Sequence, residues 1–301
     1  MPHQPEPNPA AIGGLPAHAP WPVGVVAGFT QRSGGVSAAP WSSLNLGDHV
    51  GDEPAHVQAN RQRLADGMGL HPVFLRQVHG NAVLRLQADT PDGLTADACW
   101  TDQPGLACTV LVADCLPLLL AAPDGTSVAA VHAGWRGLAG QSVSQGQGVL
   151  EALCATWPAA QHPSQRAAIR VWLGPCIGPQ RFEVGPEVRQ AFIQHDPAAA
   201  ACFVPLPGPP AVGAGAGAGA AAAPKYLADL PALARQRLAA LGFARVAGND
   251  GSAEWCTASQ PGRYFSHRRD GADRGATGRM AAWIGYAVGS PRSALRPQTQ
   301  A

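Results

Sequence analysis

The chain of 301 residues is 46% hydrophobic, which is enough for a full-size buried core in one or two domains. Its 21 lysines and arginines nearly balance its 20 aspartates and glutamates, so the net charge is +1; with no long basic run, we expect no nucleic-acid partner. No stretch reaches the roughly 18 uncharged apolar residues that a membrane span requires, so we expect no membrane partner either.

The seven cysteines are an odd number and form no CxxC pair, which argues against a disulfide framework and against a zinc ribbon. The N-terminus has neither the basic region nor the continuous apolar region of a secretory signal. Both features predict a reducing, cytoplasmic location.

We expect one folded domain over residues 23–288, with unpacked segments at both ends and one inside it. Residues 1–22 are rich in proline and have little apolar pattern, so we interpret them as a mobile tail, and residues 289–301 as a second tail. Residues 205–224 are a low-complexity run of Gly, Ala and Pro without side chains that could build a core. We interpret this run as a flexible insertion.

The first part of the domain is predicted to contain a strand, a glycine-rich loop and a helix. The strand covers residues 24–30, and the loop after it places Arg32 before two glycines, whose backbone N–H groups could bind an anion. An acidic residue followed by Pro54 is typical of a helix start. The helix is predicted to extend to Met68, where glycines end it.

Three predicted strand ends carry side chains that can bind metal or act as nucleophiles. A strand over residues 73–79 ends in His79, just before a Gly-Asn pair that is typical of a hairpin. Continuous apolar runs predict buried strands at residues 106–112, 116–122 and 127–132. Cys115 lies in the polar interruption between the first two runs, and His132 ends the third. Two glycines follow His132 closely, which indicates a tight turn and a close approach of the backbone to a ligand.

The later part of the chain is predicted to contain both helices and strands. Residues 97–101 are predicted to be a loop or a strand edge, and residues 138–157 a single helix. Further strands are predicted at 169–174 and 281–288, and further helices at 186–195 and 230–241. Cys176 follows the first of these strands in a loop flanked by two prolines, which restrict the backbone and indicate a positioned side chain.

His79, Cys115 and His132 would together supply the three protein ligands of a catalytic zinc site, which keeps a fourth position open. Their spacing matches no short zinc-binding motif. Each residue also has an ordinary explanation, because a buried cysteine is usually a small hydrophobic side chain and a histidine at a strand end is often only hydrogen-bonded. The residue types alone therefore leave both interpretations open.

Six segments resemble, in the same order, the laccase-domain family, which was once named for multicopper polyphenol oxidases and is now understood as zinc-dependent purine nucleoside phosphorylases. These segments are FLRQVHG, ADCLPLLL, VHAGWRGLAG, LGPCIGP, FEVG and YFSHRRDG, and the resemblance spans about Val23 to Val288. It implies an α+β fold with a mixed β-sandwich core flanked by helices in a single domain. It also implies that His79, Cys115 and His132 hold Zn²⁺.

The resemblance further implies phosphorolysis of adenosine, inosine and S-methyl-5′-thioadenosine, and hydrolytic deamination of adenosine. The partners are then purine nucleosides and inorganic phosphate. Zn²⁺ with one thiolate and two neutral imidazole ligands keeps a net charge of +1, which is enough to activate water for deamination. Whether the protein is a monomer or a homodimer stays open.

Phosphorolysis also requires a residue that holds phosphate, and arginine does this with two N–H donors. Arg136 is our first choice and Arg32 our second, although surface salt bridges are the ordinary role of such arginines. Asp114, beside the cysteine ligand, is predicted to orient a ligand imidazole or to carry a proton. We group Cys176 with the catalytic residues and Arg268 with the substrate-binding residues, without a specific role for either.

Other interpretations can be compared on the same residues. A multicopper oxidase needs roughly ten histidine ligands, many of them in His-X-His groups. This chain has 10 histidines in all and no two of them are two apart, so we reject that mechanism, although a single Cu²⁺ could occupy the zinc site. A Cys-His hydrolase that edits cell-wall precursors would use Cys115 or Cys176 as nucleophile and His132 as base. Structural zinc with Cys176 as fourth ligand is the non-enzymatic alternative.

Overall fold

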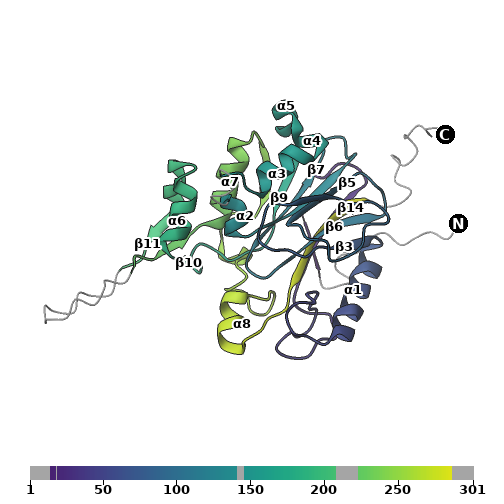
Figure 1. The fold of residues 1–301 in the computed structure, drawn as a ribbon. Helices are drawn as coiled ribbons and strands as arrows, with labels where there is room; N and C mark the ends of the chain where they lie inside the picture. Colours follow the sequence, from purple (N-terminus) through teal and green to yellow (C-terminus); the bar gives the residue numbers. More distant parts are fainter. Residues whose placement is uncertain (1–13, 18, 141–145, 208–222, 287–301) are drawn as a thin grey trace, which may run out of the picture.

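Two β-sheets lie face to face, and helices cover both outer faces (Figure 1). The computed structural model describes residues 14–17, 19–140, 146–207 and 223–286. Neither sheet closes into a barrel, and both contain parallel and antiparallel pairs. This architecture confirms the predicted α+β fold, a mixed β-sandwich flanked by helices in a single domain.

The six-stranded sheet has the strand order β13-β9-β7-β8-β5-β4. Its strands are β4 (Val83–Arg85), β5 (Ala98–Thr101), β7 (Leu116–Ala121), β8 (Val128–Ala133), β9 (Arg170–Leu173) and β13 (Arg245–Gly248). Strand β7 pairs antiparallel with both β8 and β9, whereas β4 and β13 at the edges pair parallel with their neighbours. Strands β5, β7 and β8 are buried along their whole length.

The five-stranded sheet has the order β1-β2-β14-β6-β3. Its strands are β1 (Gly14–Pro16), β2 (Val25–Thr30), β3 (His71–Phe74), β6 (Leu106–Val112) and β14 (Met280–Tyr286). Strand β14 comes from the end of the domain and pairs antiparallel with β6 and with β2. The two ends of the chain therefore contribute neighbouring strands.

The core consists of three layers because the central strands bury both of their faces. In β7, Leu118 packs against the helices while its neighbour Leu119 packs between the two sheets. In β6, Val110 packs between the sheets while Leu111 faces helix α1. Side chains of a strand alternate between its two faces, so a strand buried on both faces has an uninterrupted apolar sequence. This is the physical reason for the continuous apolar runs in this part of the chain.

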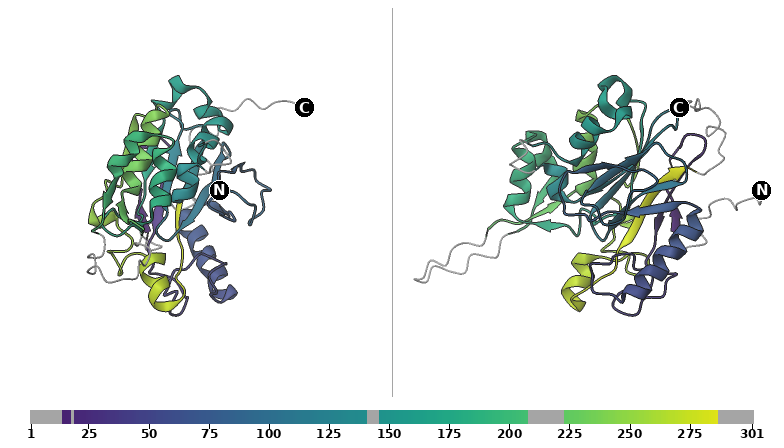
Figure 2. Two further views of the ribbon diagram at one scale, coloured as in Figure 1. Left: turned by 60° about the vertical axis from the view of Figure 1, so that its left-hand side comes forward. Right: turned by 45° about the vertical axis from the view of Figure 1, so that its right-hand side comes forward.

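The helices form the two outer layers (Figure 2). They are α1 (Pro54–Met68), α2 (Trp135–Ala139), α3 (Val149–Thr156), α4 (Pro158–Gln161), α5 (Pro163–Arg166), α6 (Pro186–Ile193), α7 (Leu230–Ala240) and α8 (His267–Arg274), and two short 3₁₀ helices cover Pro197–Cys202 and Ala253–Trp255. Helix α1 packs Leu64 and Met68 against Trp283 on the five-stranded sheet. Helices α3 and α7 cover the other sheet, for example through Leu153 and Leu238.

Local signals explain where two of these helices begin and end. Helix α1 begins at Pro54 and stops before Gly69, which has a left-handed φ of 64°, a conformation that glycine adopts without strain. Helix α7 begins after Asp229, whose carboxylate accepts a hydrogen bond from the backbone N–H of Ala232 at 2.9 Å. Both helices lie where the sequence predicts them.

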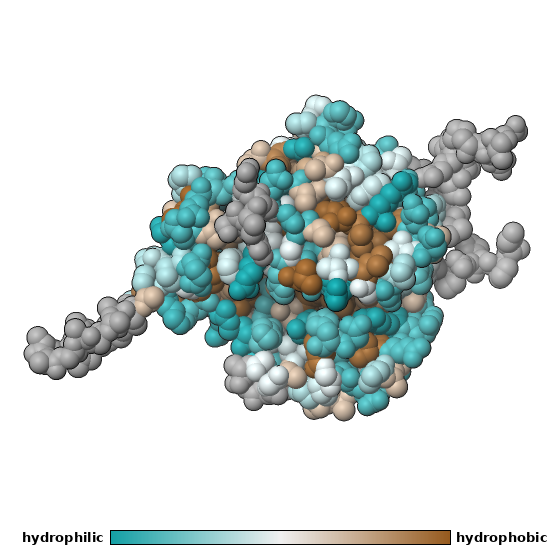
Figure 3. Space-filling model, in the orientation of Figure 1, coloured by the Kyte–Doolittle hydropathy of each residue, from teal (hydrophilic) through white to brown (hydrophobic). Residues whose placement is uncertain are grey.

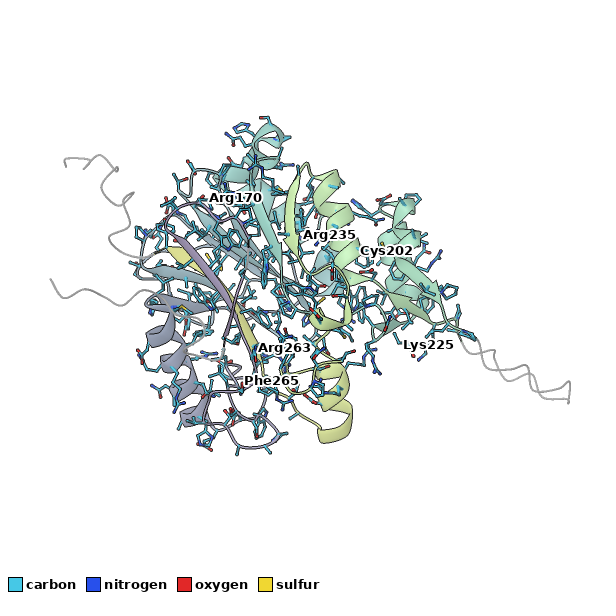
Figure 4. The ribbon with its side chains drawn as sticks, turned by 180° about the vertical axis from the view of Figure 1, so that it is seen from behind. Arg170, Cys202, Lys225, Arg235, Arg263 and Phe265 are labelled. Atoms are coloured by element: carbon cyan, nitrogen blue, oxygen red, sulfur yellow. The ribbon has the colours of Figure 1, made fainter. Side chains whose placement is uncertain are left out.

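A small three-stranded sheet projects from one side of the molecule, next to Cys202 and Lys225 (Figure 4). Its strands are β10 (Glu183–Val184), β11 (Phe203–Pro205) and β12 (Tyr226–Ala228), in the order β10-β12-β11. Most of the predicted insertion, residues 208–222, lies outside the described residues, as does the predicted tail after residue 288. The described chain leaves and re-enters this sheet at Pro205 and Tyr226, which are paired neighbours.

Several sequence-based expectations are wrong. The predicted hairpin at Gly80 does not form, because β3 and β4 on either side of it belong to different sheets. The single helix predicted over 138–157 is divided into α2 and α3, because Gly140 has a φ of 76° and leaves the helical conformation. Residues 97–101 include an inner strand, β5, rather than an edge. Strand β1 lies within the segment interpreted as an N-terminal tail.

The outer surface in the orientation of Figure 1 is mainly hydrophilic, with apolar side chains gathered near the middle of the face (Figure 3). Within the described part of the chain, no helix is both long enough and apolar enough to cross a bilayer.

Candidate metal centre

The fold brings His79, Cys115 and His132 together, as the sequence predicts. Their ligand atoms all lie within 4.8 Å of one another, and Cys115 Sγ lies 3.6 Å from His79 Nε2. The two imidazole rings are 4.9 Å apart and meet edge to face. His132 is at the end of β8, Cys115 immediately precedes β7, and His79 is in the loop after β3. The cluster thus joins residues from both sheets.

Two of the loops that form the site have an unusual backbone. His79 has a φ of 60° and Asp114 a φ of 89°, which is the left-handed region that side chains other than glycine seldom adopt. Such conformations persist where surrounding contacts hold them, and they concentrate at functional sites. Both residues have such contacts, which come from Asp97 for the first loop and from the region of α8 for the second.

Asp97 fixes the first loop and one of the imidazoles at the same time. Its buried carboxylate accepts hydrogen bonds from the backbone N–H groups of His79 at 2.9 Å and of Gly80 at 2.8 Å. It also lies 2.8 Å from His132 Nδ1. Because Nδ1 is engaged in this way, Nε2 of His132 is the nitrogen left for a metal. Sequence reasoning missed Asp97, which immediately precedes β5 and lies far along the chain from the residues it holds.

Asp114 fixes the second loop. Its carboxylate accepts hydrogen bonds from Thr257 Oγ1 at 2.6 Å, from Ser266 Oγ at 3.1 Å and from the backbone N–H of Arg268 at 2.6 Å. The last two donors belong to the first turn of α8, where a carboxylate is favourable. Asp114 therefore connects the turn that carries Cys115 to α8. The role of orienting an imidazole, which we predicted for Asp114, belongs to Asp97.

The three side chains perturb one another's proton affinities. Burial raises the pKa of the Cys115 thiol, but the charges and hydrogen bonds of His132 and His79 outweigh it and lower the pKa to about 6. Burial lowers the pKa of His132, but the Cys115 thiolate and Asp97 outweigh it and raise the pKa to about 9. Burial also raises the pKa of Asp97, but its bonds to His132 and to the backbone leave the net pKa below its ordinary value. Cys115 is therefore available as a thiolate near neutral pH.

Two glycines after His132 allow this packing, because they let the His79 loop approach α2 closely. The close approach to a ligand that we expected at these glycines stays a prediction. A Cβ atom on Gly134 would lie 2.6 Å from Cδ2 of His79. A Cβ atom on Gly137 would lie 2.7 Å from the carbonyl oxygen of Gly80. Because real Cβ contacts are longer than this, any larger residue at these positions would push the His79 loop away from α2.

The cluster opens into a cavity of about 400 Å³, a volume typical of small-molecule sites. Its apolar walls include Trp135, Ile177, Phe182 and Leu230, and its charged walls include Asp114, Arg136, Arg268 and Arg279. A site that combines flat apolar walls with several cations suits a ligand that has both an aromatic ring and an anionic group.

The donor set fits a zinc ion. Zinc–sulfur bonds of about 2.3 Å and zinc–nitrogen bonds of about 2.0–2.1 Å at a tetrahedral angle place sulfur and nitrogen ~3.6 Å apart. The separation between Cys115 Sγ and His79 Nε2 is 3.6 Å. The carboxylate behind His132 is also typical of zinc sites, where it holds the imidazole in the correct orientation.

Arg136 and Arg268 line the cavity, and Arg32 does not. The binding roles that we expected for Arg136 and Arg268 stay predictions. Arg136 is exposed and stacks on Trp135 at 4.5 Å. Arg32 stacks instead on Phe265 at 4.8 Å and donates to the carbonyl oxygen of Pro261 at 2.9 Å. Phe265 lies beside Arg263 at the back of the molecule, near the start of α8 (Figure 4). Arg32 thus ties two loops together and is not placed to bind phosphate in the cavity.

Cys176 is fully buried and does not line the cavity. Burial raises the pKa of its thiol well above the ordinary value, and the thiol contacts Asn249 Nδ2 at 3.3 Å. The metal-type cluster among the described residues does not include it. Its position therefore argues against the catalytic role we predicted and against a fourth, structural zinc ligand.

Comparisons with known proteins place the chain in a family. A family model described as multi-copper polyphenol oxidoreductase laccase matches residues 26–287. Proteins of Escherichia coli strain K12 and of Shigella flexneri, both named purine nucleoside phosphorylase YfiH, are each 44% identical to it over 267 residues, which cover 88% of this chain and 95% of theirs.

Solved structures agree with this result. The crystal structure of Neisseria meningitidis protein NMB0706 is 39% identical, with a TM-score of 0.73 over 92% of this chain and 100% of that one. That of YlmD from Geobacillus stearothermophilus is 31% identical, with a TM-score of 0.72 over 92% of this chain and 97% of that one. The chain therefore belongs to the family described as multi-copper polyphenol oxidoreductase laccase.

Proposed function

We propose that the protein is a zinc-dependent purine nucleoside phosphorylase that accepts adenosine, inosine and S-methyl-5′-thioadenosine, and that it also deaminates adenosine. The observation that carries the proposal is the cluster of His79, Cys115 and His132 at the wall of a cavity of about 400 Å³ that also has aromatic and arginine side chains. The names of the relatives that are 44% identical support the same reaction class.

The reaction requires two recognition elements, which the cavity can supply. Trp135 and Phe182 offer aromatic surfaces for a purine ring, and purines stack on such surfaces. Arg136 lies at the same cavity and offers N–H donors for phosphate oxygens. In phosphorolysis a phosphate oxygen bonds to C1′ of the ribose while the glycosidic C–N bond breaks. The electron pair of that bond goes to the purine, which then takes up a proton.

The residues around the cluster supply its geometry. Asp97 holds His132 by its Nδ1 and the loop of His79 by its backbone, so both imidazoles are oriented before any substrate binds. Bound Zn²⁺ would supply Lewis acidity, which polarises a substrate atom or activates water for deamination. Cu²⁺ could bind the same donors, because it outcompetes zinc at nitrogen and sulfur ligands.

The test is a product analysis with adenosine, carried out with and without inorganic phosphate. The proposal expects adenine and ribose 1-phosphate only when phosphate is present, and inosine in both conditions. Release of adenine at the same rate without phosphate would show hydrolysis of the glycosidic bond and would contradict a phosphorylase.

A second candidate function is a cysteine hydrolase, and one observation favours it. Asp97, His132 and Cys115 are arranged as an acid, a histidine and a thiol of lowered pKa, which is the order of groups in a cysteine nucleophile site. Cell-wall precursors would then be the substrates. A chelator separates the two proposals, because a cysteine nucleophile keeps its activity when zinc is removed.

A multicopper oxidase is not supported, despite the description of the family. Such enzymes hold several copper ions with about ten histidines. Within the described ranges, the structure has one cluster of three or more His, Cys, Asp or Glu side chains that could hold a metal. We therefore propose a site for one metal ion.

A further inference from the structure

Arg279 lines the candidate active-site cavity as a cation without a carboxylate partner. None of the arginine–carboxylate ion pairs among the described residues includes it. Removing a charge from water is costly unless an opposite charge or hydrogen bonds compensate it. A partly buried guanidinium of this kind is therefore prepared for an anionic ligand.

The arginine is held from one side only. Its Nη1 donates to the carbonyl oxygens of Thr277 at 3.0 Å and Gly278 at 3.2 Å. Its stem packs so closely on Gly47 that a Cβ atom there would lie 2.7 Å from Cγ of Arg279. Its Nε and Nη2 make no hydrogen bond to described residues. Neither nitrogen is among the side-chain atoms that are both buried and without a hydrogen-bond partner. These two nitrogens form the side of the guanidinium that binds an oxyanion with two parallel hydrogen bonds.

The register of the five-stranded sheet places this guanidinium beside the metal-type cluster. Met280, the first residue of β14, pairs with Val112, the last residue of β6. Arg279 therefore lies next to the turn that carries Asp114 and Cys115. Burial lowers the pKa of Arg279. The charges of Cys115 and Asp114 act on this pKa in the opposite direction, because both residues lie close to Arg279.

The other two arginines of the cavity are engaged differently. Arg136 is exposed and lies over Trp135. Arg268 donates through Nη2 to the carbonyl oxygen of Glu183 at 3.0 Å and lies over the ring of Phe182. Of the three, Arg279 is the least exposed residue, and its stem packs on Gly47.

We propose that Arg279 is the principal phosphate-binding residue of this site and that it holds inorganic phosphate through Nε and Nη2 next to the Cys115 turn. This assignment rests on the proposed phosphorylase function and adds a phosphate-binding residue to it. Arg136 then closes the site from the exposed side. Nothing in the motif around Gly278-Arg279 predicts the role from sequence, since it depends on the pairing of β14 with β6.

The first experiment measures binding of inorganic phosphate alone to the zinc-loaded protein by calorimetry. For Arg279→Met we expect the affinity to fall by about ten- to a hundredfold, which corresponds to one charge-assisted bidentate contact. Arg189→Met is the matched control, because Arg189 stacks on Tyr226 and does not line the cavity. Equal phosphate affinity in Arg279→Met and in the control would overturn the assignment.

The second experiment measures phosphorolysis of inosine with varied phosphate. The assignment expects a KM for phosphate raised about ten- to a hundredfold in Arg279→Met, with a much smaller change in KM for inosine. An unchanged KM for phosphate would overturn the role of Arg279 but would leave the proposed phosphorylase function intact. If the wild-type protein forms no ribose 1-phosphate but binds phosphate through Arg279, the anion site stands and the proposed function fails.

A further variant guards against misfolding. Arg279→Lys keeps the stem on Gly47 and the charge but lacks the planar pair of donors. We expect its phosphate affinity to lie between those of the wild type and Arg279→Met, with unchanged zinc content. Wild-type phosphate affinity in Arg279→Lys would show that geometry does not matter and would contradict the proposed two-nitrogen contact.

Discussion

Asp97 holds two of the three candidate ligands without being a ligand itself. It binds the backbone of the His79 loop and the imidazole of His132, and it is fully buried. The sequence does not reveal this role, because the partners of Asp97 lie 18 and 35 positions away. His79, Cys115 and His132 were predictable because each adjoins an apolar run or a family motif, whereas Asp97 has neither advantage.

The first prediction concerns this carboxylate. Asp97→Asn keeps the shape of the side chain but places an amide nitrogen against N–H donors, so we expect zinc affinity to fall by about ten- to a hundredfold. Competition against a chelator of known affinity measures the zinc affinity. Asp89→Asn is the control, because Asp89 is exposed. Unchanged zinc affinity in a folded Asp97→Asn protein would refute its positioning role.

The second prediction concerns the pH dependence of Cys115 in the zinc-free protein. Its pKa is lowered to about 6, and the thiolate is the reactive form, so alkylation by iodoacetamide should be near its maximum above pH 7 and should fall below pH 6. In His132→Ala the midpoint should move up toward the ordinary thiol value of about 8.5. Mass spectrometry of the peptide that contains Cys115 follows the alkylation in the wild type and in His132→Ala. A labelling rate that keeps rising up to pH 9 in the wild type would contradict the lowered pKa.

At the scale of elements, the sequence predicts most strands and helices but not how the strands pair. The runs at β6, β7 and β8 are recognisable because strands buried on both faces are continuously apolar. The hairpin expected at Gly80 fails because β3 pairs with β6 in one sheet and β4 with β5 in the other. A local turn signal cannot reveal that the chain changes sheets at that point, and this change is what carries His79 to the cluster.

The third prediction tests the contact between that loop and α2. Alanine is a better helix former than glycine. In Gly137→Ala, however, the new methyl group would lie 2.7 Å from the carbonyl oxygen of Gly80. We expect this crowding to prevail, to lower the free energy of unfolding by about 1–3 kcal/mol and to weaken zinc binding. Urea denaturation measures the first effect, and Gly262→Ala is the control because its Cβ would meet open space. Equal stability of the two variants would show that the loop moves freely away from α2.

At the scale of the whole molecule, the site lies where the two sheets meet. Cys115 lies in the turn between β6 of one sheet and β7 of the other, and His132 is the next-to-last residue of β8. The α+β class and the helical layers could be expected from the family motifs. The order of strands could not, because β14 reaches its place between β2 and β6 only through contacts between the two ends of the chain.

The fourth prediction concerns the low-complexity run within residues 205–224, which we propose is a flexible insertion. Pro205 and Tyr226 are paired across β11 and β12, so the ends of the insertion are already neighbours. Replacing residues 208–222 by Gly-Ser should change the free energy of unfolding by no more than about 1 kcal/mol, because loop-closure entropy depends only weakly on length. Thermal unfolding and zinc content measure the outcome. Loss of zinc from a folded shortened protein would place the insertion at the site.

The most direct test of the central claim is to measure zinc content and inosine phosphorolysis together in the wild type and in Cys115→Ala. We predict about one zinc ion per wild-type chain and formation of hypoxanthine and ribose 1-phosphate, and we predict that both are lost in the variant, because two imidazoles alone are a weak zinc site. His79→Ala and His132→Ala should also lose both the zinc ion and the phosphorolysis. Full zinc occupancy in all three variants, or undiminished phosphorolysis in zinc-free protein, would contradict a catalytic metal centre at His79, Cys115 and His132.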